Sequence, residues 1–83
     1  MKIIKRSGTE VVFDIDKIVN AIRAANLEVE EGSRLTDRQV IYAAQNVAEA
    51  CEKAGHTVSV EEIQDLVEDE IMRLDCDEVA RHY

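Results

Sequence analysis

The sequence contains no proline and no tryptophan, and its 83 residues include only three glycines, one phenylalanine and two tyrosines. Because proline and glycine interrupt helices most strongly, their scarcity beside many Ala, Glu, Val and Ile residues predicts a mostly helical domain. Apolar residues make up 46% and charged residues 34% of the chain, a balance that argues against disorder. A chain of this length can bury one modest core, so we expect a single domain over residues 1–83.

Long apolar runs and targeting signals are also absent. No stretch approaches the roughly 20 apolar residues that a membrane-spanning helix needs, and Met1 is followed almost directly by a strand-like segment. Cys51 and Cys76 form no disulfide framework, which favours two reduced thiols. We therefore expect a cytoplasmic protein without a membrane partner.

Positive charge is scarce as well. Ten Lys and Arg residues face eighteen Asp and Glu residues, for a formal net charge of −8. Nucleic-acid binding needs a basic face, so this balance makes nucleic acid an unlikely partner. One bound nucleotide remains compatible with it, because local cations decide such binding and a divalent metal would cancel much of a triphosphate's charge.

The residues that could carry catalysis or hold a metal do not form a recognisable group. No base is paired with a nucleophile, and the acids of residues 61–70 are interpreted as the solvated outer face of a helix. His56, His82 and the two cysteines fit no zinc-binding spacing. We expect no catalytic residue, no metal site and no enzyme activity in this domain itself.

The order of elements begins with two short strands, at residues 2–6 and 9–13, joined by a two-residue Ser7-Gly8 turn. Alternation along the strands places Ile4, Val11 and Phe13 toward the core and Lys5 on the other face. Helices are expected at about residues 14–26, 36–54 and 59–74, with a short third strand or turn at 56–58. Their start signals are Asp14, the Thr36/Gln39 capping box and the Ser59/Glu62 capping box.

Residues 78–83 begin a fourth helix that barely completes two turns. An isolated helix this short is marginal, so we expect the native chain to continue past Tyr83 and this helix to be truncated.

Three cations stand out near the N-terminus of this acidic chain. Lys5 and Arg6 lie on the hairpin, and Lys17 lies in the first turns of the helix that follows. Cations held over a helix start suggest an anion site, and a triphosphate is the leading candidate. From the residues alone, Lys5 and Arg6 are more often charges that keep an edge strand from aggregating, and Lys17 a surface residue that pairs with nearby acids.

Four motifs in this order resemble the ATP-cone family over the whole chain. They are Lys5-Arg6-x-Gly8, Phe13-Asp14-x-x-Lys17-Ile18, the residues 60–68 (VEEIQDLVE) and the residues 78–83 (EVARHY). The resemblance implies an α+β, mainly helical fold, in which a four-helix bundle is capped by a small three-stranded sheet with an N-terminal β-hairpin lid.

The resemblance also implies roles for individual residues in nucleotide binding. Lys5 and Arg6 match lid cations and Lys17 matches a phosphate contact; Ser59 lies near a polar residue that meets the phosphates. Ile3, Asp14 and Ile18 fall where the family encloses adenine, and Gln64 falls near the ribose. Two positions depart from the family, because Ser7 stands where many members have Asp and Val11 where some have Glu.

The implied function is allosteric control of a ribonucleotide reductase by ATP or dATP, with Mg²⁺ on the phosphates. Residues 60–68 and 78–83 most resemble the anaerobic ribonucleoside-triphosphate reductase, so the implied partners are a catalytic domain in the same chain and further copies through oligomerisation. Two alternatives stay open. They are the nucleotide-sensing half of a reductase-gene repressor, disfavoured because no zinc ribbon precedes Met1, and a helical protein-interaction module without a ligand, docking through its acidic third helix.

Overall fold

Side-chain caps begin the three long helices at the positions that the sequence signals. The computed structural model describes residues 1–74 and 77–83. Its elements are β1 (Lys2–Ile4), β2 (Glu10–Val12), α1 (Ile15–Leu27), a short 3₁₀ turn (Glu31–Ser33), α2 (Asp37–Lys53), β3 (Val58–Ser59), α3 (Val60–Arg73) and α4 (Asp77–His82). Asp14 caps α1 by accepting a hydrogen bond from the Asp16 amide at 3.0 Å. Both predicted capping boxes are present, and Gly55 takes the expected left-handed conformation after α2 (φ 74°).

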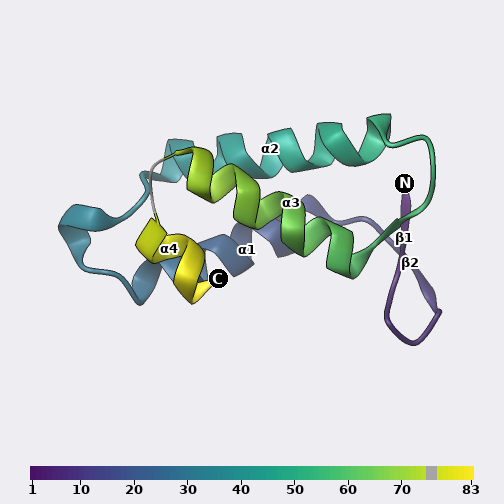
Figure 1. Cartoon of the computed structure of the whole chain (residues 1–83), viewed down its shortest axis with the longest axis horizontal. Helices are drawn as coiled ribbons and strands as arrows, with labels where there is room; N and C mark the ends of the chain where they lie inside the picture. Colours follow the sequence, from purple (N-terminus) through teal and green to yellow (C-terminus); the bar gives the residue numbers. More distant parts are fainter. Residues whose placement is uncertain (75–76) are drawn as a thin grey trace.

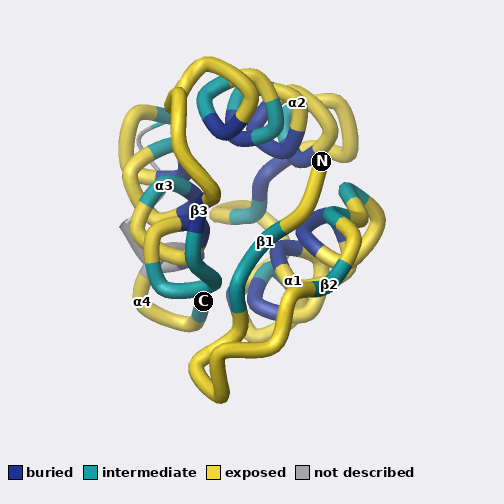
Figure 2. The backbone as a smooth tube through the Cα atoms, turned by 90° about the vertical axis from the view of Figure 1, so that its right-hand side faces the viewer, coloured by how far each residue is buried: buried dark blue, intermediate teal, exposed yellow. Residues whose placement is uncertain are grey.

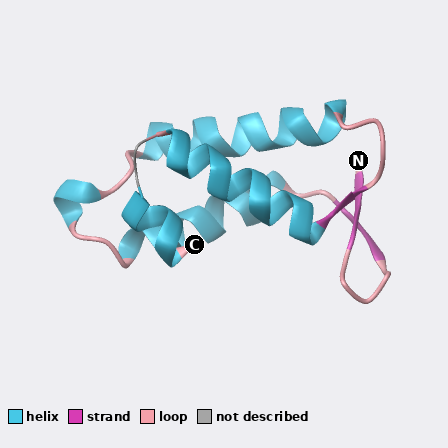
Figure 3. Cartoon of the chain, viewed as in Figure 1, coloured by secondary structure: helices cyan, strands magenta, loops and turns pink. Residues whose placement is uncertain are grey.

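The small sheet lies at one end of the helices, and the connection between α1 and α2 lies at the other (Figure 1). Its strand order is β2-β1-β3, with β1 antiparallel to β2 and parallel to β3. Figure 3 shows the hairpin projecting beyond the helices. The predicted small, mainly helical α+β fold with a three-stranded sheet is therefore confirmed.

The hairpin turn is longer than predicted. β1 ends at Ile4 and β2 begins at Glu10, so Lys5 and Arg6 belong to the turn and not to a strand. The turn is closed by the Lys5 amide, which donates to the Thr9 carbonyl, and by the Gly8 amide, which donates to the Lys5 carbonyl, each at 2.9 Å. Gly8 has a φ of 88°, which glycine adopts without strain.

The core lies between α1, α2 and α3, and the hairpin is mostly exposed (Figure 2). Ile22, Val47, Val67 and Ile71 are fully buried there. Phe13 packs against this core as predicted, but Ile3 packs there in place of Ile4 among the described residues. The shift by one position follows from the pleat, since neighbouring strand residues face opposite sides of a sheet.

The expected four-helix bundle is not confirmed. Three long helices form the body, whereas α4 has six residues and packs against α1 and α3. Val79 is its fully buried contact with the core. The predicted break before α4 falls at residues 75–76, which lie outside the described residues. Among those that are described, no helix is long and apolar enough to cross a membrane.

Buried positions of the helices should contribute more to stability than exposed ones. Ile22 is fully buried on α1, whereas Ile41 is 37% exposed on α2. We expect Ile22→Val to lower the free energy of unfolding by about 1 kcal/mol, because it removes a buried methylene and leaves a cavity. The matched Ile41→Val change should cost less than about 0.5 kcal/mol. Urea denaturation followed by circular dichroism measures both, and equal losses would contradict this account of the core.

Candidate functional site

Two adjoining cavities lie between the hairpin and the helices α1 and α3. The first is open, has a volume of about 440 Å³, and is lined by Lys5, Arg6, Ser7, Val60, Glu61 and Gln64. The second has a volume of about 280 Å³ and is lined by Ile3, Lys5, Val11, Val12, Phe13, Asp14, Lys17, Ile18, Ala21, Val60, Ile63, Gln64 and Tyr83. The linings of both cavities include Lys5, Val60 and Gln64, so the two lie next to each other, one mostly apolar and the other lined by charged side chains.

The apolar part is assembled from four elements. Ile3 comes from β1, Ile18 from α1 and Ile63 from α3, and Tyr83 follows α4. Tyr83 is held in place by its amide, which donates to the Val79 carbonyl at 3.0 Å. Burial raises the pKa of its phenol, and the charge of nearby Glu68 raises that pKa further. A partly buried aromatic ring among branched side chains can bind a flat apolar group.

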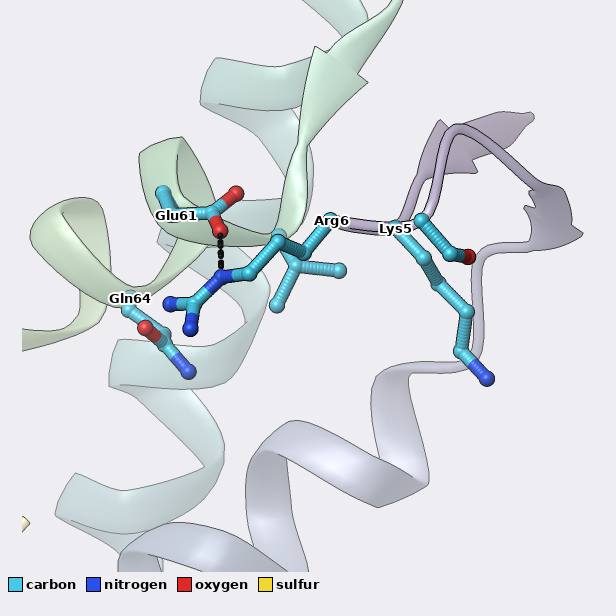
Figure 4. Close-up of a pocket in the computed structure, with 6 residues that line it drawn as sticks. Lys5, Arg6, Glu61 and Gln64 are labelled. Carbon is cyan, nitrogen blue, oxygen red and sulfur yellow. Dashed lines mark hydrogen bonds and ion pairs between the residues drawn. The ribbon is translucent and has the colours of Figure 1, made fainter.

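The cations of the site point in different directions. Lys5 and Lys17 line the apolar cavity together with Asp14, and all three are exposed to solvent. Figure 4 shows Lys5 and Arg6 pointing apart, with Arg6 directed at Glu61 and Gln64 on α3. Lys5 and Lys17 thus line the same cavity, whereas Arg6 lines only the open one.

Arg6 is already paired in this structure. Its Nε donates to Oε1 of Glu61 at 3.0 Å, across 55 residues of sequence. This hydrogen bond is the main reason that the pKa of Glu61 lies below its ordinary value of 4.5. Glu61 is 45% exposed and still belongs to the solvated face predicted for residues 61–70. Glu70 at the end of that face does not, because its side chain is only 13% exposed and accepts from Asn46 and Arg73.

Ser59 lies outside the lining of both cavities. Its hydroxyl accepts from the Glu62 amide at 3.1 Å, and its amide donates to the Glu62 carboxylate at 3.4 Å. Its observed contacts are therefore those of a helix cap. The other seven predicted residues, Ile3, Lys5, Arg6, Asp14, Lys17, Ile18 and Gln64, all line one of the two cavities or both.

The cap at Ser59 is extended by His56. Nδ1 of His56 lies 3.0 Å from the Ala54 carbonyl, and Nε2 lies 2.9 Å from the Glu62 carboxylate. A carbonyl and a carboxylate only accept, so both ring nitrogens are used fully when both carry hydrogen. The Glu62 hydrogen bond is the main cause of the raised pKa of His56, and the same bond lowers the pKa of Glu62.

Several lining residues were not predicted as site residues. Tyr83 belonged to a quoted motif, but nothing in its spacing signalled that it would reach the hairpin. The position of Glu61 at the cavity could not be predicted locally, because it depends on a contact between segments that are far apart in the sequence. Val11 was expected to face the core and instead lines the apolar cavity, where it offers no polar atom to a bound base.

Neither metal chemistry nor a reactive thiol is built into the described part of the chain. No group of three or more His, Cys, Asp or Glu side chains there could hold a metal ion. Cys51 is a free, buried thiol, and burial is the main reason that its pKa is raised. Cys76, the other predicted thiol, lies outside the described residues.

Comparison with known proteins agrees with this architecture. The family described as the ATP cone domain matches residues 1–83. The vitamin B12-dependent ribonucleoside-diphosphate reductase of Thermoplasma acidophilum is 39% identical over 99% of the chain, and the anaerobic ribonucleoside-triphosphate reductase of Haemophilus influenzae is 32% identical over 98%. In each case the chain spans 11% of the length of that relative. The chain therefore belongs to the ATP-cone family, and these two relatives are reductases of two types.

The contact between His56 and Glu62 predicts a pH dependence at the start of α3. Because the pKa of His56 is raised on folding, its contribution to stability is complete below the ordinary value of 6.5 and is lost as the pH rises through the raised value. Glu62 behaves in the opposite way, since its contribution is present above 4.5 and is lost as the pH falls through its lowered pKa. The pair therefore stabilises the fold between the two titrations.

We expect Glu62→Gln to lower the pKa of His56, because the substitution removes the negative charge that holds the imidazolium. NMR titration of the His56 ring measures this pKa directly. Glu49→Gln removes a carboxylate that is paired instead with Lys53 at 2.6 Å, and should leave the His56 pKa nearly unchanged. A His56 pKa that is the same in Glu62→Gln and in the unmodified protein would contradict the contact.

Proposed function

We propose that this chain is an allosteric nucleotide-binding domain that controls the overall activity of a ribonucleotide reductase. Domains of the ATP-cone family bind ATP or dATP as allosteric effectors. One observation carries the proposal for this chain, namely that an apolar cavity lies next to an open cavity lined by Lys5, Arg6 and Glu61 beside the hairpin. A nucleoside triphosphate has the same division into a flat, weakly polar base and a polyanionic tail.

The base would occupy the apolar cavity, with Ile3 and Ile18 on its faces and Asp14 accepting from its exocyclic amine. The phosphates would lie near Lys5, which lines both cavities, and near Lys17, which lines the apolar one; both side chains are exposed. Gln64 lines both cavities, so it would meet the ribose between them. Since ATP and dATP differ only in the 2′-hydroxyl, Gln64 is the proposed residue for telling them apart.

The other predicted phosphate groups would act less directly. Arg6 lines the open cavity and could reach the outer phosphates once it leaves Glu61. Ser59 would act through the helix start that it caps. Mg²⁺ would be held largely by the phosphates and by water, as this ion usually is, which suits a site without a cluster of acidic ligands in the described residues.

The proposed mechanism is a switch by linkage. A bound effector shifts the larger protein between two states only by its different affinity for them, and such couplings are typically about 1–3 kcal/mol. The hairpin is the proposed moving part, because its turn is mostly exposed and projects beyond the helices. A reductase catalytic domain in the same chain would receive the signal, with oligomerisation through the cone as its output, in the cytoplasm.

We further propose the anaerobic ribonucleoside-triphosphate reductase as the host protein. The sequences of residues 60–68 and 78–83 favour this host, and the relative from Haemophilus influenzae is an anaerobic ribonucleoside-triphosphate reductase. The relative from Thermoplasma acidophilum belongs to the vitamin B12-dependent type and has the higher identity, so the sequence of the adjoining catalytic domain is the direct test.

Isothermal titration calorimetry with ATP and dATP in the presence of Mg²⁺ tests the function. We expect stoichiometric binding that weakens at least about ten-fold in the double variant Lys5→Ala, Lys17→Ala, because each charge-assisted hydrogen bond contributes roughly 1.5–3 kcal/mol. The control is Arg38→Ala, Lys53→Ala, which removes two positive charges from α2 outside both cavities.

Two results would contradict the proposal. Equal weakening in the control would mean that only the overall charge matters. The absence of a binding signal at millimolar nucleotide, in the folded protein without substitutions, would favour the alternative. That alternative is a helical interaction module that has no ligand and docks through the acidic face of α3.

A further inference from the structure

The contact between Arg6 and Glu61 ties the hairpin turn to the first turn of α3. The two residues lie in segments that the fold brings together from 55 positions apart, and the guanidinium meets the carboxylate at 3.0 Å. The Arg6 side chain is 88% exposed and that of Glu61 45% exposed. No other hydrogen bond or ion pair between side chains of the turn (residues 5–9) and α3 is recorded in the described residues. The contact is therefore a single, solvent-exposed latch.

This latch occupies Arg6, one of the two cations that line the open cavity. Arg6, Glu61 and Gln64 line the same cavity, and Figure 4 shows the Arg6 side chain directed at Glu61 on α3. A carboxylate and a phosphate both bind a guanidinium through charge-assisted hydrogen bonds, with similar geometry. They also repel each other when they lie side by side, so the Glu61 carboxylate opposes a phosphate in this cavity on two counts.

We infer that Glu61 is an intramolecular competitor of the effector's phosphates for Arg6, and so an affinity-determining residue of the site. The inference rests on the proposed function. In the free protein Glu61 holds Arg6 and the hairpin turn against α3. Phosphate binding transfers Arg6 from the carboxylate to the nucleotide and releases the turn from α3. The rearrangement involves no covalent step.

A different arrangement predicts the opposite sign. If Glu61 bound the effector's Mg²⁺, the carboxylate would be a ligand of the complex, and its removal would weaken binding. The direction of the change in affinity on removing Glu61 therefore decides between a competitor and a metal ligand.

The experiment is calorimetry of Mg-ATP binding to Glu61→Gln, which keeps the size of the side chain and removes its charge. We expect the dissociation constant to fall roughly two- to five-fold, because losing an exposed ion pair typically changes an equilibrium constant by this factor. The matched control is Glu30→Gln, the same chemical change in the connection between α1 and α2, at the opposite end of the helices (Figure 1). An unchanged or raised dissociation constant in Glu61→Gln, or an equal fall in the control, would overturn the inference.

Two further variants separate pairing from general repulsion. Glu61→Asp keeps the charge but shortens the side chain. It should therefore release Arg6 and show part of the increase in Mg-ATP affinity expected for Glu61→Gln. In an Arg6→Gln background, Glu61→Gln should gain much less than in the unmodified protein, as in any double-mutant cycle for a direct contact. An equal gain in both backgrounds would show that Glu61 acts without Arg6.

Hydrogen exchange in the absence of nucleotide makes the latch testable apart from the function. The turn amides of Lys5 and Gly8 are hydrogen-bonded, and their exchange should speed up roughly two- to five-fold in both Arg6→Gln and Glu61→Gln. Faster exchange without any nucleotide binding in the unmodified protein would defeat the proposed function and leave the latch standing. Unchanged exchange and affinity, in a protein that binds ATP, would defeat the latch alone.

Discussion

Pairing between β1 and β3 is the constraint on which the site depends. Ile3 lies opposite Val58 and Ile4 opposite Ser59 in a parallel ladder. Ser59 is also the cap of α3, so the last residue of β3 is joined directly to the helix start. Two residue pairs therefore fix the hairpin next to the first turn of α3. This pairing supports the position of Lys5 at the apolar cavity and brings Arg6 within reach of Glu61.

The capping at the β3–α3 junction supports this constraint. Ser59 and Glu62 satisfy two backbone groups at the helix start, and His56 contacts the same carboxylate from the preceding turn. These contacts hold the direction in which the chain passes from β3 to α3. A site at this junction is therefore built on backbone and cap geometry more than on the long side chains that line it.

Local signals in the sequence were sufficient to predict the helices. Caps and turns act over three or four residues, so Asp14, the Thr36 box and the Ser59 box could be recognised one at a time. The strand register was harder, because a shift of one residue exchanges the two faces of a strand. Ile3 and Ile4 are equally apolar, and the choice between them is made by pairing with both β2 and β3, which a local pattern does not contain.

The candidate site shows the same division between local and long-range information. The resemblance of the motifs placed seven of the eight predicted residues around the cavities, because those positions follow from the order of elements. It did not identify Glu61 or Tyr83. Their roles come from contacts between distant segments, namely α3 with the hairpin turn and the residue after α4 with the apolar cavity.

The charges close to the cavities decide how this chain meets a polyanion, and the net charge of the whole chain matters less. A net charge of −8 would repel a triphosphate if it were spread evenly. Screening shortens that repulsion to about 8–10 Å at physiological salt, so the charges that line the cavities matter most. There, Lys5 and Lys17 face one carboxylate, Asp14, and Arg6 faces another, Glu61. A polyanion would meet a surplus of positive charge locally although the whole molecule is acidic.

A weak latch suits a sensor better than a strong one. Any free energy that holds Arg6 on Glu61 is subtracted from the binding of an effector that needs Arg6. Because it is exposed to solvent, this ion pair contributes less free energy than a typical allosteric coupling. The pair can therefore keep the empty hairpin in one position and still give way to a nucleotide. A buried pair at the same place would cost several kcal/mol to break. Arg6 would then stay on the carboxylate of α3, and the effector could not displace it.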